Sequence, residues 1–349
     1  MTTLSLPQIG RDTLTHSRIA CARTCQRKEW FRYEIGITPD RTAKPLRMGS
    51  AVHDGLDLWR RGVDQGDAIF QATQGYAELP AWARDDEARD EWLTEAETVR
   101  RLLAGYYWRW ADHFLETVAS EETFIQSIVN PESNQPARIL NVAGKIDGVV
   151  KLNDGRLAVL ETKTVGQDIS AESDYWKQKR MDAQISLYVL AARRAGHNVT
   201  AVLYDAIRKP TIKPRKLTKA EQSMVVNDGH WCGEDVGKQA VERETPVMFG
   251  ARLNADIAER PDFYFQRIEI ARLESDLTEF ERELWDEQQA LQARRKRGIW
   301  PRNTSACLTF GRCQYLDLCT AGWTPEQGMP SGFVITDQVH PELVNGENE

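Results

Sequence analysis

The sequence predicts an α/β protein in which a mixed β-sheet is flanked by helices. The prediction rests on the order of patterns along the chain. Helical periodicity comes first, a meander of strands follows, and helix and strand then alternate, which is unlike a bundle or a sandwich. The 349 residues, 41% of them hydrophobic and 28% charged, can bury a large core, which excludes a chain dominated by disorder. The length favours about two domains, and one enlarged α/β domain is also compatible with it.

The amino-terminal part of the chain is predicted to be mainly helical. Ser17 is a candidate N-cap for a helix over residues 18–33, and a second helix is expected over residues 48–59. Residues 67–116 continue with a helical, aromatic-rich pattern that breaks around residues 79–80. We interpret this stretch as a helical insertion.

The middle of the chain changes to a strand pattern. Residues 123–129 and 139–152 are predicted strands, and Asn153-Asp154-Gly155 is a strong turn signal. The turn predicts a hairpin that joins residues 144–152 to residues 157–164. The remaining expected elements are a helix over 174–194, strands over 199–207 and 263–270, and a long charged helix over 273–297.

These elements divide the chain into five predicted segments, and we see no internal repeat. The segments are N-terminal helices with a cysteine and a histidine motif (1–66), the helical insertion (67–120), a core of sheet and helices (121–270), a C-terminal helix with a cysteine cluster (271–325) and a tail (326–349).

Charge and apolar patterning restrict the class of protein. Lys and Arg number 45 against 52 Asp and Glu, so the formal charge of −7 excludes a globally basic surface but allows a local basic channel. Residues 208–219 and 294–297 are basic runs that could line such a channel, and a solvated face is the alternative reading. No apolar run approaches the ~20 residues of a membrane span, and no secretory signal is evident. We expect a cytoplasmic protein that does not bind membranes.

One hairpin carries the residues best suited to catalysis. Alternation along a strand places Glu161 and Lys163 on the same side, and Asp147 on the adjoining strand can face Glu161. Two carboxylates suit Mg²⁺, and a nearby ammonium can orient water and stabilise developing charge. The alternative is a surface salt bridge at a strand end.

Two further features accompany the hairpin. Gln184 and Tyr188 lie one helical turn apart and therefore on one face of the following helix. His53 lies in Met48-Gly49-Ser50-Ala51-Val52-His53, within an expected early helix, where a structural role is the alternative to metal binding. The remaining histidines, His16, His113, His197, His230 and His340, are expected to be structural.

Taken in order, these residues resemble the RecB-like branch of the PD-(D/E)XK nuclease superfamily. The matching set is His53, Asp147, Glu161, Lys163, Gln184 and Tyr188. The resemblance covers roughly residues 17–210 together with the C-terminal cysteines, and it implies a restriction-endonuclease-like core for the predicted sheet.

The resemblance also implies a role for each residue. Mg²⁺ or Mn²⁺ would be held by one imidazole, two carboxylates and one backbone carbonyl, those of His53, Asp147, Glu161 and Thr162. Asp147, Glu161 and Lys163 would be catalytic, with Lys163 as the catalytic lysine. Gln184 and Tyr188 would lie beside the site and contact DNA.

The cysteines suggest a second metal centre. Cys307, Cys313 and Cys319 follow a Cys-x5-Cys-x5-Cys spacing, and three thiols need a fourth ligand to close a tetrathiolate site. Cys25 is the expected fourth ligand, and Cys21, one turn earlier, is the alternative. Six cysteines are too few for a disulfide scaffold in a reducing compartment.

The cysteine pattern resembles the iron–sulfur-containing subgroup of RecB-like nucleases, which includes CRISPR-associated and phage exonuclease-like proteins. That resemblance implies a [4Fe–4S] cluster that joins the two ends of the nuclease domain. Here the first C-terminal gap is five residues, where the family pattern has two. Zn²⁺ in the same site and ordinary core cysteines are the alternatives. Cys21 and Cys232 are expected to be buried free thiols.

The expected function is therefore a metal-dependent DNA nuclease, an exonuclease acting on DNA ends or single strands. The sequence lacks a Gly-x4-Gly-Lys-Ser/Thr loop, which favours a stand-alone enzyme. The resemblance implies phage or prophage recombination or DNA processing in a bacterial cytoplasm, beside a recombinase or single-strand annealing protein. A catalytically inactive DNA- or partner-binding protein of the same fold is the alternative. A zinc hydrolase is disfavoured, because no His-Glu-x-x-His occurs and the His-x-Glu of His340 and Glu342 lies in the tail.

Overall fold

The computed structural model describes residues 10–41, 43–113, 115–309 and 311–343. Residues 1–9, which begin the first predicted segment, and residues 344–349, which end the last one, lie outside the described residues. The described chain contains a six-stranded mixed sheet in the order β1-β4-β5-β6-β9, with β3 paired to β4. The strands are β1 (Thr13–Leu14), β3 (Glu116–Val129), β4 (Pro136–Lys151), β5 (Leu157–Val165), β6 (Val199–Arg208) and β9 (Phe265–Ala271). The predicted α/β class with a mixed sheet is confirmed.

Strand β4 organises the centre of this sheet. One of its edges pairs antiparallel with β3 along most of its length. Its other edge is shared, because β1 pairs in parallel with residues 141–142 and β5 pairs antiparallel with residues 148–151. The stretch between these two pairings, residues 143–147, has no strand beside it on that edge among the described residues.

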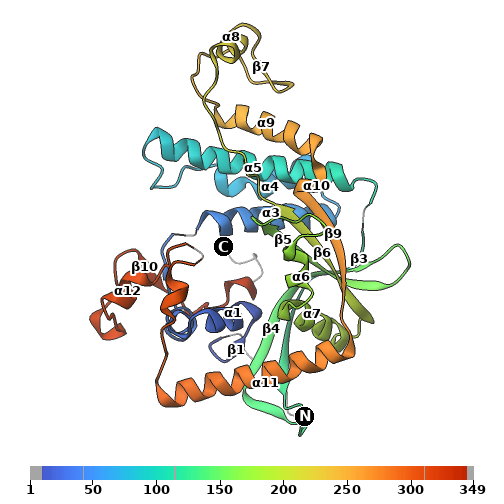
Figure 1. Ribbon diagram of the computed structural model, residues 1–349, viewed down its shortest axis with the longest axis vertical. Coiled ribbons are helices and arrows are strands. Elements are labelled where there is room, and N and C mark those ends of the chain that lie inside the picture. The colour runs from blue at the N-terminus through green and yellow to red at the C-terminus, as the bar shows by residue number, and fades with distance from the viewer. Residues whose placement is uncertain (1–9, 42, 114, 310, 344–349) are drawn as a thin grey trace.

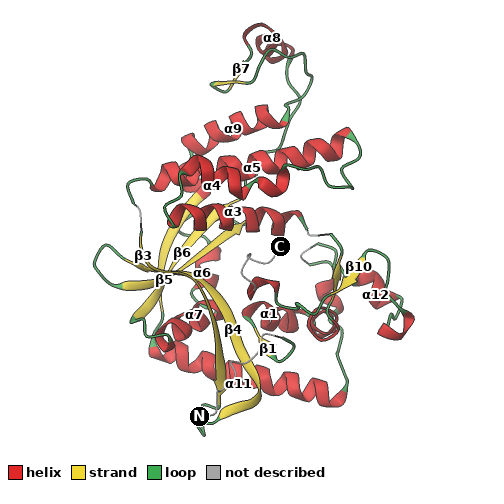
Figure 2. Ribbon diagram, turned by 180° about the vertical axis from the view of Figure 1, so that it is seen from behind, coloured by secondary structure: helices red, strands yellow, loops and turns green. Residues whose placement is uncertain are grey.

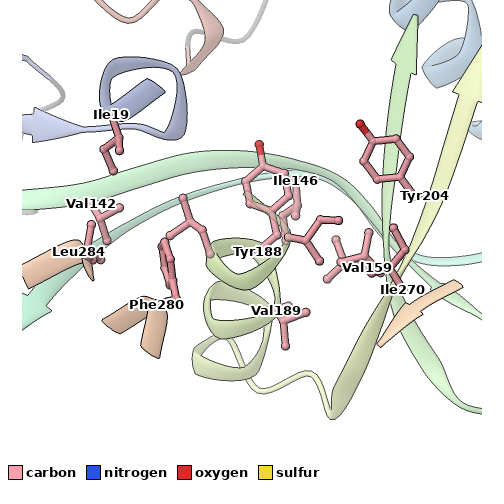
Figure 3. Close-up of a cluster of buried hydrophobic side chains, with 14 of the residues drawn as sticks. Ile19, Val142, Ile146, Val159, Tyr188, Val189, Tyr204, Ile270, Phe280 and Leu284 are labelled. Carbon is pink, nitrogen blue, oxygen red and sulfur yellow. The ribbon is translucent and has the colours of Figure 1, made fainter. Parts of the chain in front are cut away.

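Helices cover both faces of the sheet (Figures 1 and 2). On one face, α7 (Ala183–Arg194) and α11 (Glu274–Arg297) pack against apolar side chains of β4 and β5. Figure 3 shows this core, in which Val142 and Ile146 of β4 lie near Tyr188 of α7 and Phe280 and Leu284 of α11. On the other face, α3 (Lys44–Arg60), α5 (Asp86–Trp110) and α9 (Pro246–Glu259) form a second core with residues of β6 and β9.

Segments around residues 30–39 and 313–335 form one lobe beside the sheet (Figure 1). Strand β10 (Phe333–Ile335) pairs antiparallel with β2 (Ile37–Pro39). Phe31, on the amino-terminal side, shares a core with Tyr315, Leu318 and Trp323, close to α12 (Leu316–Thr320). The lobe thus joins segments that lie nearly 300 residues apart in sequence.

The remaining elements are shorter. They are α1 (His16–Thr24), α2 (Gln26–Glu29), α4 (Gln65–Ala72), α6 (Asp174–Lys179), α8 (Lys219–Asp228), α10 (Pro261–Tyr264), β7 (His230–Trp231), β8 (Glu234–Asp235), a π-helical turn (Trp30–Ile35) and 3-10 turns (Gln74–Tyr76, Thr304–Cys307, Pro325–Gln327 and Pro341–Leu343). Helix α8 and strand β7 project beyond α9 at one end of the molecule (Figure 1). Within the described residues, no helix combines the length and the apolar character that crossing a bilayer requires.

Two predicted helices are interrupted. The helix expected over 18–33 breaks at Cys25, whose backbone is extended (φ −161°, ψ 115°). The helix expected over 174–194 is two helices, because Asp182 is extended and its side chain accepts a hydrogen bond from the backbone N–H of Gln184. A side chain that caps a new helix competes with continuation of the previous one. The break places the amino terminus of α7 beside the hairpin that carries the predicted site.

Candidate active site

The site begins where β4 and β5 separate. Their ladder ends at the pair Gly148 and Leu160, so the next backbone N–H on β5 has no strand partner on β4. The carboxylate of Asp147 takes its place, because Oδ2 accepts a hydrogen bond from the backbone N–H of Thr162 at 2.7 Å. Asp147 is therefore fixed at the unpaired edge of β4 and satisfies a backbone donor there.

Glu161 and Lys163 lie on the same side of β5, as the alternation of the strand predicts. The side chain of Glu161 is 1% exposed, and its Oε1 is 2.5 Å from Nζ of Lys163. Burial raises the pKa of Glu161 to about 7; Lys163 lowers that pKa and the charge of Asp147 raises it further. Burial lowers the pKa of the Lys163 ammonium, but Glu161, Tyr188 and Asp147 together raise it further, so the net shift is upward and Lys163 is a cation at neutral pH.

The Oε1 oxygen of Glu161 has an ion-pair partner but no well-aligned hydrogen bond. Nζ of Lys163 lies 2.5 Å away, yet within the described residues no contact to this oxygen has the geometry of a hydrogen bond. A buried carboxylate with this single charge partner can also accept a metal cation. The donors gathered here are two carboxylates and an imidazole, which suit Mg²⁺ or Mn²⁺.

His53 reaches the site from α3. Its Nδ1 lies 3.8 Å from Oδ2 of Asp147. Burial lowers the pKa of His53, against the opposing effect of Asp147, so the imidazole is neutral near pH 7, which is the form that ligates metals. Helix α3 can approach β5 closely because Gly49 has no side chain there. A Cβ at that position would lie 3.3 Å from Oγ1 of Thr164.

Gln184 and Tyr188 form one side of the site on α7. Nε2 of Gln184 donates a hydrogen bond to the Tyr188 hydroxyl at 2.8 Å. Because that oxygen accepts from Gln184, its own O–H can donate to a group in the site. Burial raises the pKa of Tyr188, which keeps this proton in place.

These side chains share a cavity of about 580 Å³. Five of the predicted residues line it, namely His53, Asp147, Lys163, Gln184 and Tyr188. Glu161 and Thr162 are buried in the strand beside it, at 1% and 0% exposure. The structure thus brings together all the residues predicted for catalysis and the active-site metal.

Other residues of the cavity were not predicted. Lys145, which lies within the Gly-Lys-Ile-Asp-Gly motif, pairs with Glu121 of β3 at 2.8 Å, and both line the cavity. Lys209, from the first predicted basic run, lines it as well. The position of Lys145 two residues before Asp147 could have identified it, since both point to the same side of a regular strand. Glu121 carries no such signal.

Two residues that were expected to be remote also reach the cavity. His16 was expected to be structural, and it lines the cavity with Nε2 3.5 Å from Oδ1 of Asp182. Glu342 was assigned to the tail, and it lines the cavity as well. Its carboxylate accepts a hydrogen bond from Thr15 at 3.0 Å. Both depend on contacts between distant parts of the chain, which local patterns do not encode.

The basic run over residues 294–297 contributes two arginines to internal ion pairs. Arg294 is 5% exposed and pairs with the buried Glu29 at 3.2 Å. Arg295 pairs with Asp12 and Glu34. These two arginines attach α11 to the amino-terminal segments, so they are occupied by internal ion pairs.

The four cysteines predicted to bind a cluster gather in the lobe beside the sheet. The backbone N–H of Asn303 donates to Sγ of Cys25 at 3.4 Å, and the Asn303 carbonyl accepts from Sγ of Cys307 at 3.9 Å. Burial raises the pKa of Cys319, and the nearby Cys25 and Cys313 contribute to that increase.

The described chain has no preformed ligand cage. No three His, Cys, Asp or Glu side chains in it are close enough together to enclose a metal ion as they stand. The donor types fit the proposed metals in both places, but the side chains would have to move closer together on binding. The expectation that Cys21 and Cys232 are buried is not met in full: Cys21 is half-buried, and Cys232 is exposed in the turn between β7 and β8, with a positive φ of 48°.

The chain is similar to known proteins in sequence and in structure. The sequence profile of the PD-(D/E)XK nuclease superfamily matches residues 13–320, from β1 to the end of α12. No curated protein matches the chain significantly. Among solved structures, the chain is similar to a protein described as "putative exonuclease" from Eubacterium rectale (12% identity, 90% of this chain and 89% of that chain, TM-score 0.43). It is also similar to SSO0001 (12% identity, 92% and 90%, TM-score 0.32).

Proposed function

Because this chain belongs to the PD-(D/E)XK nuclease superfamily, whose members cleave nucleic acid and generally use divalent metals, we propose that it is a deoxyribonuclease of the RecB-like branch. The proposed activity is Mg²⁺- or Mn²⁺-dependent exonuclease cleavage at DNA ends or of single strands. One observation carries the proposal: Asp147, Glu161 and Lys163 converge where β4 and β5 separate, next to a cavity.

The proposed roles are those that the resemblance implies. His53, Asp147, Glu161 and the backbone carbonyl of Thr162 would hold the metal, which when bound would supply Lewis-acid activation of the scissile phosphate. Lys163 would orient the attacking water and stabilise charge that develops on the phosphate.

The walls of the cavity would position the DNA. The Tyr188 hydroxyl, which already accepts a hydrogen bond from Gln184, would donate its proton to a phosphate oxygen. Lys145 and Lys209, which line the same cavity, would neutralise neighbouring phosphates.

We further propose that Cys25, Cys307, Cys313 and Cys319 hold a [4Fe–4S] cluster, with Zn²⁺ as the alternative occupant. Support comes from Asn303, which contacts both Cys25 and Cys307, and from Cys313 and Cys319, which pack against the core of the same lobe. Iron content and the visible spectrum of anaerobically purified protein distinguish the two metals without an activity assay.

The biological setting rests on the resemblance alone. On that resemblance we propose a role in phage or prophage recombination or DNA processing, in a bacterial cytoplasm, beside a recombinase or single-strand annealing protein. Co-purification with such a protein from phage-infected cells would test this part of the proposal.

The test of the proposed activity uses end-labelled single- and double-stranded DNA with Mg²⁺ or Mn²⁺. We expect cleavage by the wild-type protein and loss of most cleavage in Glu161→Ala and Lys163→Ala, with DNA binding retained in EDTA. Full activity of Glu161→Ala would overturn the assignment. DNA binding by the wild type without cleavage under either metal would favour an inactive binding protein of the same fold.

A further inference from the structure

The side of β5 that faces away from Glu161 and Lys163 also contacts the site. Thr162 lies between these two residues and points to the opposite side of the strand, where it is fully buried. Its Oγ1 accepts a hydrogen bond from Nη2 of Arg60 at 2.8 Å. Thr162 is therefore held through its side chain by Arg60 and through its backbone N–H by Asp147.

Arg60 comes from the same helix as His53. It is the last residue of α3, seven positions after His53, and seven positions are close to two full turns. The two side chains consequently leave the helix in nearly the same direction. Helix α3 contacts the site twice, once at Asp147 through His53 and once at Thr162 through Arg60.

We propose that Arg60 is a positioning residue of the nuclease, which fixes Thr162 so that its backbone N–H and carbonyl present Asp147 and the metal site in a productive geometry. This inference rests on the proposed function. Arg60 acts through Thr162, and no described contact joins it directly to the cavity that the predicted catalytic residues line.

A buried hydrogen-bond network lies beside Thr162 on the neighbouring strand. Asp205 is the register partner of Thr162 on β6 and is fully buried. It accepts hydrogen bonds from the Tyr106 hydroxyl and, at 2.9 Å, from Nε of Arg267. Arg267 also donates to the Tyr106 hydroxyl at 2.7 Å, which closes the network.

The charges in this network favour an arginine at position 60. Burial lowers the pKa of Arg60, but Tyr106, Asp205 and Asp147 raise it, and the net shift is upward. A guanidinium in such a place stays charged and offers several donors in a fixed plane, whereas a lysine offers a single mobile ammonium. Charged groups away from water are tolerated when they are paired in this way.

The test compares the metal affinity of matched variants. Arg60→Gln removes the charge, and Thr162→Val removes the acceptor while conserving shape. Thr162→Ser keeps the hydroxyl. Lys44→Gln is the control on the same helix, where the side chain is 43% exposed and pairs with Glu91, and neither residue lines the cavity. Mn²⁺ binding is measured by calorimetry on protein without DNA, together with melting temperature, DNA binding in EDTA and the Mn²⁺ dependence of cleavage.

We expect Arg60→Gln and Thr162→Val each to weaken Mn²⁺ binding about tenfold, as is typical for residues that orient metal ligands. The double variant should bind Mn²⁺ no more weakly than the weaker-binding single variant, because both substitutions remove the same Arg60–Thr162 hydrogen bond. Thr162→Ser should bind Mn²⁺ more tightly than Thr162→Val, because it keeps the hydroxyl. Lys44→Gln should bind Mn²⁺ like the wild type, and DNA binding in EDTA should be unchanged throughout.

Three results would contradict the inference or the function on which it rests. Wild-type Mn²⁺ affinity in Arg60→Gln with a lower melting temperature would show a structural role only and would overturn the inference. If the fold-losses of Mn²⁺ affinity in the two single variants multiply in the double variant, the inference is overturned as well. If Arg60→Gln does not fold, the comparison of Thr162→Val with Thr162→Ser decides. Failure of the wild type to bind Mn²⁺ or cleave DNA would overturn the proposed function itself, and this inference with it.

Discussion

At the scale of single residues, the site is defined by carboxylates placed where the protein alone does not stabilise them fully. Glu161 is buried beside a single ammonium and keeps one oxygen without a good hydrogen bond in the described chain. Asp147 replaces a missing strand partner. The sequence predicted both residues and the side of the strand on which Glu161 lies. It could not predict the burial, because burial depends on α3 and α7.

The raised pKa of Glu161 predicts how metal-free stability depends on pH. A carboxyl whose pKa rises on folding, here to about 7 from 4.5, stabilises the folded state below its unfolded pKa, and that contribution is lost as pH rises through the folded pKa. In EDTA, the free energy of unfolding should therefore fall between about pH 5 and pH 7 in the wild type, relative to Glu161→Gln, by at most about 1.4 kcal/mol per pH unit.

Thermal melts of both proteins across this pH range would measure the effect. Excess Mn²⁺ should remove the difference in slope, because metal binding requires the deprotonated carboxylate. Parallel curves in EDTA would show that Glu161 is already ionised in the metal-free fold.

Asp147 allows its two roles to be separated. Asp147→Asn keeps an oxygen that can accept the Thr162 N–H but removes the charge, whereas Asp147→Leu removes both. We expect both variants to lose Mn²⁺ binding and most cleavage, and Asp147→Leu alone to lose a further ~1–3 kcal/mol of stability through the unsatisfied backbone donor. Urea unfolding in EDTA measures that difference. Equal stabilities would mean that the hydrogen bond contributes nothing to the fold.

At the scale of elements, α3 and α7 complete the site beside the β4–β5 hairpin by adding His53, Gln184 and Tyr188 to the cavity. Periodicity predicted the strands β4, β5 and β6 closely, because alternation and the Asn-Asp-Gly turn are local signals. The break between α6 and α7 was missed, because residues 179–182 contain neither Gly nor Pro. The start of β3 at Glu116 was also missed, since its first residues have mixed burial instead of a regular alternation.

The packing of α3 can be tested at Gly55. A Cβ there would lie 2.5 Å and 2.9 Å from the two terminal methyl groups of Leu103 on α5. Gly55→Ala should therefore destabilise the protein by ~1–3 kcal/mol despite the better helix propensity of alanine, and should weaken Mn²⁺ binding through His53. The cost should be smaller in a Leu103→Ala background, where the clash is absent. An additive double variant would show that Leu103 is not the obstacle.

At the scale of the whole molecule, the lobe beside the sheet could be predicted from the sequence only through the cysteines. The pairing of β2 with β10 has no local signal, because it joins segments nearly 300 residues apart. The same distance explains why the approach of Glu342 to the cavity was not predicted. The segment boundaries remain predictions.

The cysteine lobe yields a prediction about stability. A cluster shared by Cys25 and Cys319 would close a loop of most of the chain, which by analogy with disulfides contributes on the order of a few kcal/mol. Cys25→Ser and Cys319→Ser should bleach anaerobically purified protein and lower its melting temperature. Cys21→Ser and Cys232→Ser, the controls, should do neither. Loss of iron in Cys21→Ser with retention in Cys25→Ser would identify Cys21 as the ligand.

The place of residues 341–343 against β4 has a consequence for synthesis. Glu342 and Leu343 help to enclose the cavity, yet they leave the ribosome long after His53, Asp147 and Lys163. At roughly 5–20 residues per second, the delay between Lys163 and Glu342 is on the order of ten seconds or more. During that interval the nascent chain holds every residue proposed for the active-site metal while one wall of the cavity is absent. The complete cavity therefore forms only after residues 342–343 have been synthesised.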